Sequence, residues 1–142
     1  MRRLLLPLIT LTALVGCGPS RSDFWDEQLN PLLVEFEAQD QLAASAPRGQ
    51  LAPVIGEMSN LQQQMKDLFE STGTPNCAIR GMSALLTSTS SVISAAEDWA
   101  TTEARWSTRQ LADHDQRVAR EWTTAYEGFH SAQATIIDDC GF

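Results

Sequence analysis

The stretch LAPVIGEMSNLQQQMKDLFESTGTP, residues 51–75, decides the fold class of this chain. Its apolar side chains recur at alternating intervals of three and four residues, which places them on one face of an α-helix. They are Leu51, Val54, Met58, Leu61, Met65 and Leu68. Gly73 is the expected left-handed terminator of this helix, and Thr74 and Pro75 are the expected cap and first residue of the next one. A continuous seam of this kind predicts one helix of a bundle.

Three further stripes with helical spacing flank this stretch, and no segment from Ser22 onward shows the strict alternation of a half-buried strand. Ser22 or Asp23 is the expected cap of the first helix. Pro31 either starts a helix capped by Asn30 or kinks one that has already begun. The stripes are Trp25, Leu29, Leu32, Leu33, Phe36 and Ala43; Ile79, Met82, Leu86, Val92 or Ile93, Ala96 and Trp99; and Leu111, Val118, Trp122, Ala125, Phe129, Ala132 and Ile136.

Residues 1–16 have the features of a secretory signal. Arg2 and Arg3 precede an apolar run of twelve residues, Leu4 to Val15. This run is shorter than the roughly 20 residues that a membrane-spanning helix needs. An ordinary signal peptide with a chance cysteine is one alternative. Export by the twin-arginine route is another, although the residues that normally flank the arginine pair are absent.

The run ends in Leu14-Val15-Gly16-Cys17, which resembles the lipobox of bacterial lipoproteins. The resemblance covers only this signal segment. It implies that the Cys17 thiol receives a diacylglycerol, usually with palmitate-type chains, and that the signal is cut before Cys17. Two or three acyl chains anchor a protein stably to a membrane. Gly18, in place of the aspartate that retains enteric lipoproteins at the inner membrane, implies the periplasmic face of the outer membrane in a host with two membranes.

The remaining cysteines, Cys77 and Cys140, are expected to form a disulfide, since exported proteins fold under oxidising conditions. Their separation of 63 residues would be roughly 95 Å along an unbroken helix, whereas bonded cysteines lie within about 7 Å. The chain must therefore reverse near residue 108. Ser107 and Gln110 have capping-box spacing at that point, with Trp106 placed as a hydrophobic staple. If the last two stripes instead formed one helix, Cys140 would bond a second protomer in an elongated coiled coil.

These expectations give an all-α, up-down-up-down antiparallel four-helix bundle with one disulfide. The predicted organisation is a cleaved signal at residues 1–16, a lipidated tether at 17–22 and a helical bundle domain at 23–142. The length of 142 residues suits one such domain. The net charge of −8 is the wrong sign for tracking phosphate backbones and argues against a nucleic-acid partner.

One candidate binding surface lies at the end of the predicted bundle furthest from Cys17. The turns there bring together Arg48, Arg105, Trp106 and Arg109, which belong to residue types that are frequent in contact hot spots. The alternative is that Trp106 only staples a helix and that the arginines are solvated.

A second candidate is a small-ligand or metal site inside the bundle. Glu127 and His130 have the Glu-x-x-His spacing of di-iron bundles, but the further ligands of a di-iron site are missing. A mononuclear site would use His114 together with these two residues. His114 shares the face of Leu111 and Val118, so a partly buried structural histidine is expected. The third helix is rich in hydroxyls, and its small residues (Ala84, Ser88, Ser91 and Ala95) indicate either close helix packing or a polar pocket.

The sequence contains no constellation of nucleophile, base and oxyanion hole, so no enzymatic activity is predicted. Asp138, Asp139, Asp113 and Asp115 are expected to be solvated charges. The favoured role is a membrane-anchored, non-enzymatic interaction or structural module that meets another envelope protein. Its only cofactor would be the covalent lipid on Cys17. The alternative role is a periplasmic small-ligand or metal-binding bundle, and the oligomeric state stays open.

Overall fold

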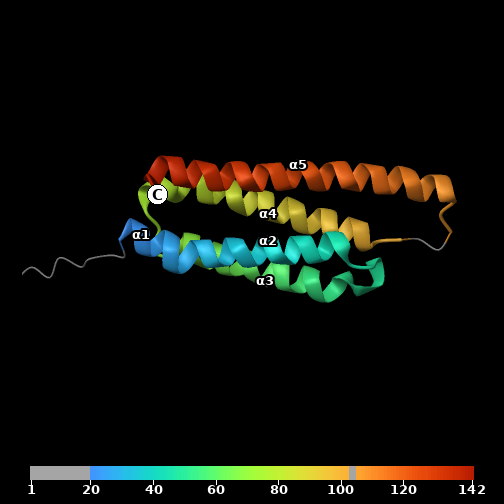
Figure 1. Ribbon diagram of the computed structural model, residues 1–142, viewed down its shortest axis with the longest axis horizontal. Helices are drawn as coiled ribbons and strands as arrows, with labels where there is room; N and C mark the ends of the chain where they lie inside the picture. Colours follow the sequence, from blue (N-terminus) through green and yellow to red (C-terminus); the bar gives the residue numbers. More distant parts are fainter. Residues whose placement is uncertain (1–19, 103–104) are drawn as a thin grey trace, which may run out of the picture.

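The computed structural model describes residues 20–102 and 105–142, which form four long helical segments (Figure 1). The predicted all-α antiparallel bundle is confirmed, and the described residues contain no strand. The first segment joins α1 (Arg21–Asp23), the π-helical turn η1 (Phe24–Leu29) and α2 (Asn30–Ser45); the others are α3 (Leu51–Glu70), α4 (Ile79–Ala100) and α5 (Thr108–Cys140). Short 3-10 turns, η2 (Arg48–Gln50) and η3 (Asn76–Ala78), precede α3 and α4.

The disulfide between Cys77 and Cys140 is confirmed, with the two Cα atoms 5.2 Å apart. It fastens η3 to the last residue of α5 and closes a hairpin made by α4 and α5. The bond lies within one chain, so the reversal between α4 and α5 replaces the alternative of one continuous helix. The start of α1, the disulfide and the C-terminus share one end of the bundle (Figure 1).

Helices α4 and α5 pack so closely that a glycine is required between them. A Cβ atom added to Gly81 would lie 2.3 Å from Cγ1 of Ile136 and 3.0 Å from its backbone nitrogen. One added to Gly128 would lie 3.0 Å from Oγ of Ser88. The small residue Ser88 therefore serves close packing, as the sequence suggested.

Helices α2 and α5 instead meet through large side chains. The ring of Phe36 stacks on that of Phe129 at a centroid distance of 5.3 Å, and both residues are fully buried. At the disulfide end Trp25 stacks on Phe142, also at 5.3 Å. Aromatic rings of this size hold the two backbones apart, which leaves a seam whose width varies along the bundle.

The start of the first segment shows how the chain accommodates Pro31. The expectation that Ser22 or Asp23 caps this helix is wrong: the cap is Ser20, which forms a capping box with Asp23, so the helix begins at Arg21. In the π-helical turn that follows, the Asn30 N–H donates to the Trp25 carbonyl, five residues back. This wider turn makes room for a proline ring that would otherwise press on the preceding turn. Pro31 thus lies inside a continuous helical segment.

Two expectations about helix ends had different outcomes. The capping box of Ser107 and Gln110 at the start of α5 is confirmed. The prediction that Gly73 is left-handed is wrong, since the one positive-φ residue among those described is Gly141, which ends α5 at φ 73°. Helix α3 ends without a left-handed residue because the hydroxyls of Ser71 and Thr74 both donate to the carbonyl of Leu68.

The core follows the predicted stripes apart from the first turn of α4. Ile79 was expected to be buried, but it is 46 % exposed. Leu85, which the sequence reading passed over, is fully buried, and Val92 and Ile93 are both buried. The buried face here runs through Ala78, Met82 and Leu85, which leaves Ile79 on the outer side of α4. No helix in the described residues combines the length and hydropathy that crossing a bilayer requires.

Candidate functional site

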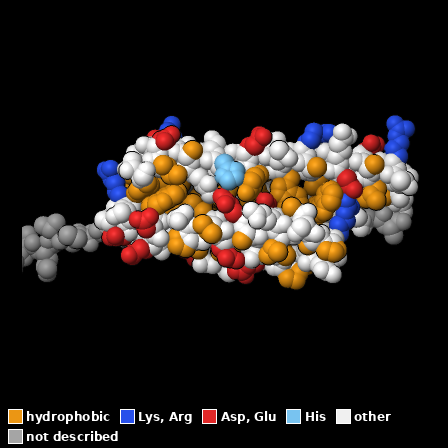
Figure 2. All heavy atoms as spheres, in the orientation of Figure 1, with side chains coloured by type: hydrophobic (Ala, Val, Ile, Leu, Met, Phe, Trp, Pro, Cys, Tyr) orange, Lys and Arg blue, Asp and Glu red, His pale blue; other side chains and the backbone are white. Residues whose placement is uncertain are grey.

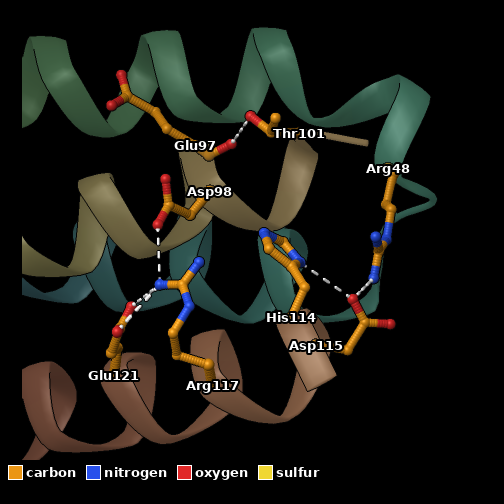
Figure 3. A network of polar contacts seen from close by, with 8 residues as sticks. All are labelled: Arg48, Glu97, Asp98, Thr101, His114, Asp115, Arg117 and Glu121. Carbon is orange, nitrogen blue, oxygen red and sulfur yellow. Dashed lines mark hydrogen bonds and ion pairs between the residues drawn. The ribbon is translucent and has the colours of Figure 1, made fainter. Parts of the chain in front are cut away.

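The end of the bundle opposite the disulfide contains a compact cluster around Arg48. Its guanidinium group pairs with the Asp115 carboxylate, and its Cζ lies 4.2 Å from the ring centroid of Trp99. Figure 3 shows His114 on the other side of Asp115, with its Nδ1 3.3 Å from Asp115 Oδ1. The Arg48 Nη1 atom is buried without a hydrogen-bond acceptor, which fits its place over an aromatic face. Arg48 therefore joins η2 to α4 and α5.

The other predicted surface residues lie further out at the same end. Trp106 is half-buried, and its ring contacts the His114 ring at a centroid distance of 4.8 Å. Arg105 and Arg109 are exposed. The His114 side chain is only 11 % exposed, in keeping with its place on the apolar face of α5. The structure thus brings the four residues to one end, but Arg48 packs inward while Arg105 and Arg109 project outward.

Two aspartates that were expected to be solvated are paired. The hydrogen bond from Arg48 holds the pKa of Asp115 below its ordinary value, with a smaller contribution from His114. Asp139 accepts two-pronged hydrogen bonds from Arg80, at 2.9–3.1 Å, next to the disulfide. Both pairs connect residues far apart in the sequence, which explains why local spacing did not reveal them.

A second candidate site is a groove along the seam between α2 and α5, with α4 beneath it. Figure 2 shows hydrophobic side chains gathered along this seam. The groove has a volume of about 350 Å³, and its walls include Asp40, Trp99, Trp122 and Tyr126. Asp40 is only 7 % exposed, and its Oδ1 accepts a 2.6 Å hydrogen bond from the Trp122 indole N–H. We call this site the aromatic groove.

Burial raises the pKa of Asp40 above its ordinary value of 3.8. The Trp122 hydrogen bond acts in the opposite direction, Glu37 raises the pKa further and His130 lowers it. Burial also raises the pKa of Tyr126, with Glu37 and Asp40 adding to the effect. The walls of the aromatic groove therefore hold a carboxylate that is costly to ionise.

The Asp40→Asn variant tests this cost. A carboxyl group with a raised folded-state pKa opposes folding once it ionises, so its cost appears as pH rises from 3.8 through the folded-state pKa. Asparagine keeps an oxygen for the Trp122 N–H and carries no charge. We expect Asp40→Asn to melt at a higher temperature than the parent at pH 7, and the difference to shrink as pH falls toward 4. Thermal melts followed by circular dichroism from pH 3.5 to 8 measure this, and a variant that melts lower at pH 7 would refute it.

The residues weighed as ligands of an alternative metal site are not brought together. His130 lies with Nδ1 3.8 Å from Glu37 Oε1, and its ring contacts that of Tyr126, while Glu127 is exposed. His114 belongs to the cluster at the other end of α5. Within residues 20–102 and 105–142, no group of three or more His, Cys, Asp or Glu side chains has the arrangement of a metal site.

The hydroxyl-rich face of α4 lines a shallow groove beside α5. Its hydroxyls donate to carbonyls of their own helix: Thr87 to Ser83, Ser88 to Ala84 and Ser91 to Thr87. The donor capacity of these three hydroxyls is therefore used within their own helix.

Sequence reasoning missed Asp40, although a signal was present. Asp40 lies four residues after Phe36 and three before Ala43, on the face that both residues bury. A carboxylate at a buried position of an apolar stripe is uncommon unless it has a partner. Its partner, Trp122, lies 82 residues away in the sequence.

Comparisons with protein-family models, curated proteins and solved structures find no match for this chain.

Proposed function

We propose that the protein is a lipid-anchored lipoprotein of the bacterial envelope whose helical body is a non-enzymatic interaction module. The observation that carries the proposal is the Leu14-Val15-Gly16-Cys17 sequence after a basic start and a short apolar run. Cys17 and residues 1–19 lie outside the described residues, so this step rests on the resemblance to a lipobox. With Gly18 after the lipid site, the proposed location is the periplasmic face of the outer membrane if the host has two membranes.

The geometry of the bundle supports different roles for its two ends, one next to the membrane and the other in contact with a partner protein. Helix α1 begins at Arg21, and four residues of extended chain reach at most about 14 Å. A lipid on Cys17 would therefore keep the disulfide end close to the membrane. The 33 residues of α5 span about 50 Å, so the opposite end would stand well clear of the headgroups.

The proposed contact surface is this distal end, where Arg105 and Arg109 are exposed and Trp106 is half-buried against His114. Arg48 beneath them ties η2 to α5 through Asp115. Arginine and tryptophan are enriched among the residues that dominate binding energy. On a chain of net charge −8, a cationic end would select an acidic surface of another envelope protein.

The Cys17→Ser variant tests the anchor. We expect cells fed a labelled fatty acid to label the parent protein and not the variant, because the thioether requires the thiol. The Arg120→Ala variant, an exposed change on α5, is the control and should be labelled like the parent. After cell fractionation the parent should remain with the membranes. Equal labelling of Cys17→Ser and the parent would refute the anchor.

A triple variant, Arg105→Ala/Trp106→Ala/Arg109→Ala, tests the contact surface. We expect in-cell crosslinking to the partner protein to fall about tenfold or more, as for the loss of a contact hot spot. Arg120→Ala, which removes an exposed charge from the middle of α5, should leave crosslinking unchanged. Identical crosslinked bands for the triple variant and the parent would exclude the distal end as the contact surface.

A further inference from the structure

We propose that the aromatic groove binds a small organic cation, with Asp40 as counter-ion and with Trp99, Trp122 and Tyr126 as aromatic walls. The inference goes beyond the proposed interaction role and does not depend on the lipid anchor. It rests on a cavity, on a buried carboxylate that lines the cavity, and on the class of ligand that such a combination attracts.

Asp40 supplies the charge. Its Oδ1 is held by the Trp122 N–H at 2.6 Å. Among the described residues, Asp40 has no other hydrogen-bond or ion-pair partner, although it is only 7 % exposed. A buried carboxylate without a cation nearby is unfavourable, and a cation in the cavity would relieve that cost. The Asp40 carboxylate therefore favours a positively charged ligand in the cavity.

The aromatic rings supply the remaining attraction. Cations bind the faces of tryptophan and tyrosine, and organic ammonium ions do so in cages of such rings. Trp99 already holds the Arg48 guanidinium 4.2 Å from its ring centroid, so the free ring faces for a ligand are those of Trp122 and Tyr126, and Trp99 closes the end of the groove. The hydrogen bond to Asp40 fixes the orientation of the Trp122 ring, so this wall of the cage is formed before a ligand arrives.

The charges around the groove favour a cation as well. Glu37 is close enough to raise the pKa of both Asp40 and Tyr126, which indicates a negative potential along this part of the seam. The Trp122 hydrogen bond and His130 act on the pKa of Asp40 in the opposite direction. An anion would meet the Asp40 carboxylate and is excluded as a ligand.

The contacts on either side of the groove limit the ligand to a small molecule. Toward the disulfide end, Gln133 of α5 donates to Glu37 of α2 at 3.3 Å. Toward the distal end, Arg48 pairs with Asp115 and closes the seam. The cavity between these two bridges, about 350 Å³, suits a compact ammonium compound. The two bridges would interrupt an extended peptide that lay along the seam.

Choline and its neutral isostere 3,3-dimethylbutan-1-ol test the proposal, with the mature chain kept in a neutral maltoside detergent. The readouts are the indole N–H resonance of Trp122 and tryptophan fluorescence. We expect saturable binding of choline with an affinity about tenfold or more above that of the alcohol, because only choline carries the charge. Asp40→Asn should weaken choline binding about tenfold and leave the alcohol unaffected. Glu121→Gln, an exposed change on α5, should alter neither.

Equal affinities for choline and the alcohol would overturn the proposal, as would full choline binding by a correctly folded Asp40→Asn variant. Because asparagine retains the acceptor for Trp122, this variant separates the loss of charge from the loss of structure. A groove that takes a lysine-containing peptide but not choline would also overturn the proposal, since the ligand would then be a partner's side chain.

Discussion

The Cys77→Ser/Cys140→Ser variant is expected to lose about 4 kcal/mol of unfolding free energy, the chain-entropy value for a loop of 63 residues. The loss is comparable to the whole stability of many small domains. It should be visible as a lower midpoint in urea unfolding followed by circular dichroism. The bond joins the end of α5 to η3, so we expect the hairpin of α4 and α5 to loosen from that end first.

The control for this prediction is reduction. A reducing agent should lower the midpoint of the parent to that of the double variant, and it should leave the double variant itself unchanged. A parent protein whose midpoint moves by less than the equivalent of about 1 kcal/mol on reduction would show that the disulfide does not determine the stability of the bundle.

Phe129→Ala is expected to cost about 3–5 kcal/mol, the usual range for removing a buried aromatic side chain. Phe129 is fully buried and stacks on Phe36, and its ring centroid is 6.0 Å from that of Tyr126. Rings of this size fill the seam between α2 and α5, so the surrounding helices are poorly placed to collapse into the space. Urea unfolding of the variant measures the effect.

Val34→Ala is the matched control for Phe129→Ala. Val34 is 59 % exposed on α2, so its truncation should change the unfolding free energy by no more than about 0.5 kcal/mol. Similar losses for the two variants would contradict the assignment of the aromatic seam as the core between α2 and α5.

Much of the fold was predictable because helical periodicity is a local property. The Leu51 to Leu68 stripe became the buried face of α3, with Leu51, Met58, Leu61 and Met65 in the core. The turn before α5 carries no glycine or proline signal, and its position came from the cysteine separation together with the Ser107 capping box. A covalent constraint thus located a turn that the local residues alone left ambiguous.

The errors have two physical origins, one local and one in contacts between distant segments. The burial of Ile79 was wrong because Ala78, Met82 and Leu85 form the buried face of this part of the chain instead. The expected left-handed Gly73 was wrong because the hydroxyls of Ser71 and Thr74 satisfy the Leu68 carbonyl instead. Asp139 pairs with Arg80, 59 residues earlier in the sequence. Of these contacts, the pair of Asp139 and Arg80 is the one that no window of one helix can reveal.

The two candidate sites also differ in how far the sequence alone predicts them. The distal end follows from the positions of the turns, so its residues were predictable, whereas the inward packing of Arg48 on Trp99 was not. The aromatic groove requires α2, α4 and α5 to be assembled, since its carboxylate and its rings come from all three. In the sequence, only the unusual place of Asp40 on an apolar stripe indicated the aromatic groove.

The central claim is that the mature protein begins at a lipid-modified Cys17. Mass spectrometry of the protein purified from its native membranes, intact and after digestion, tests it most directly. We expect the N-terminal peptide to start at Cys17 and to carry a diacylglyceryl group, with or without a further acyl chain on its amine. A mature chain that starts elsewhere, or an unmodified thiol at Cys17, would exclude the lipid anchor.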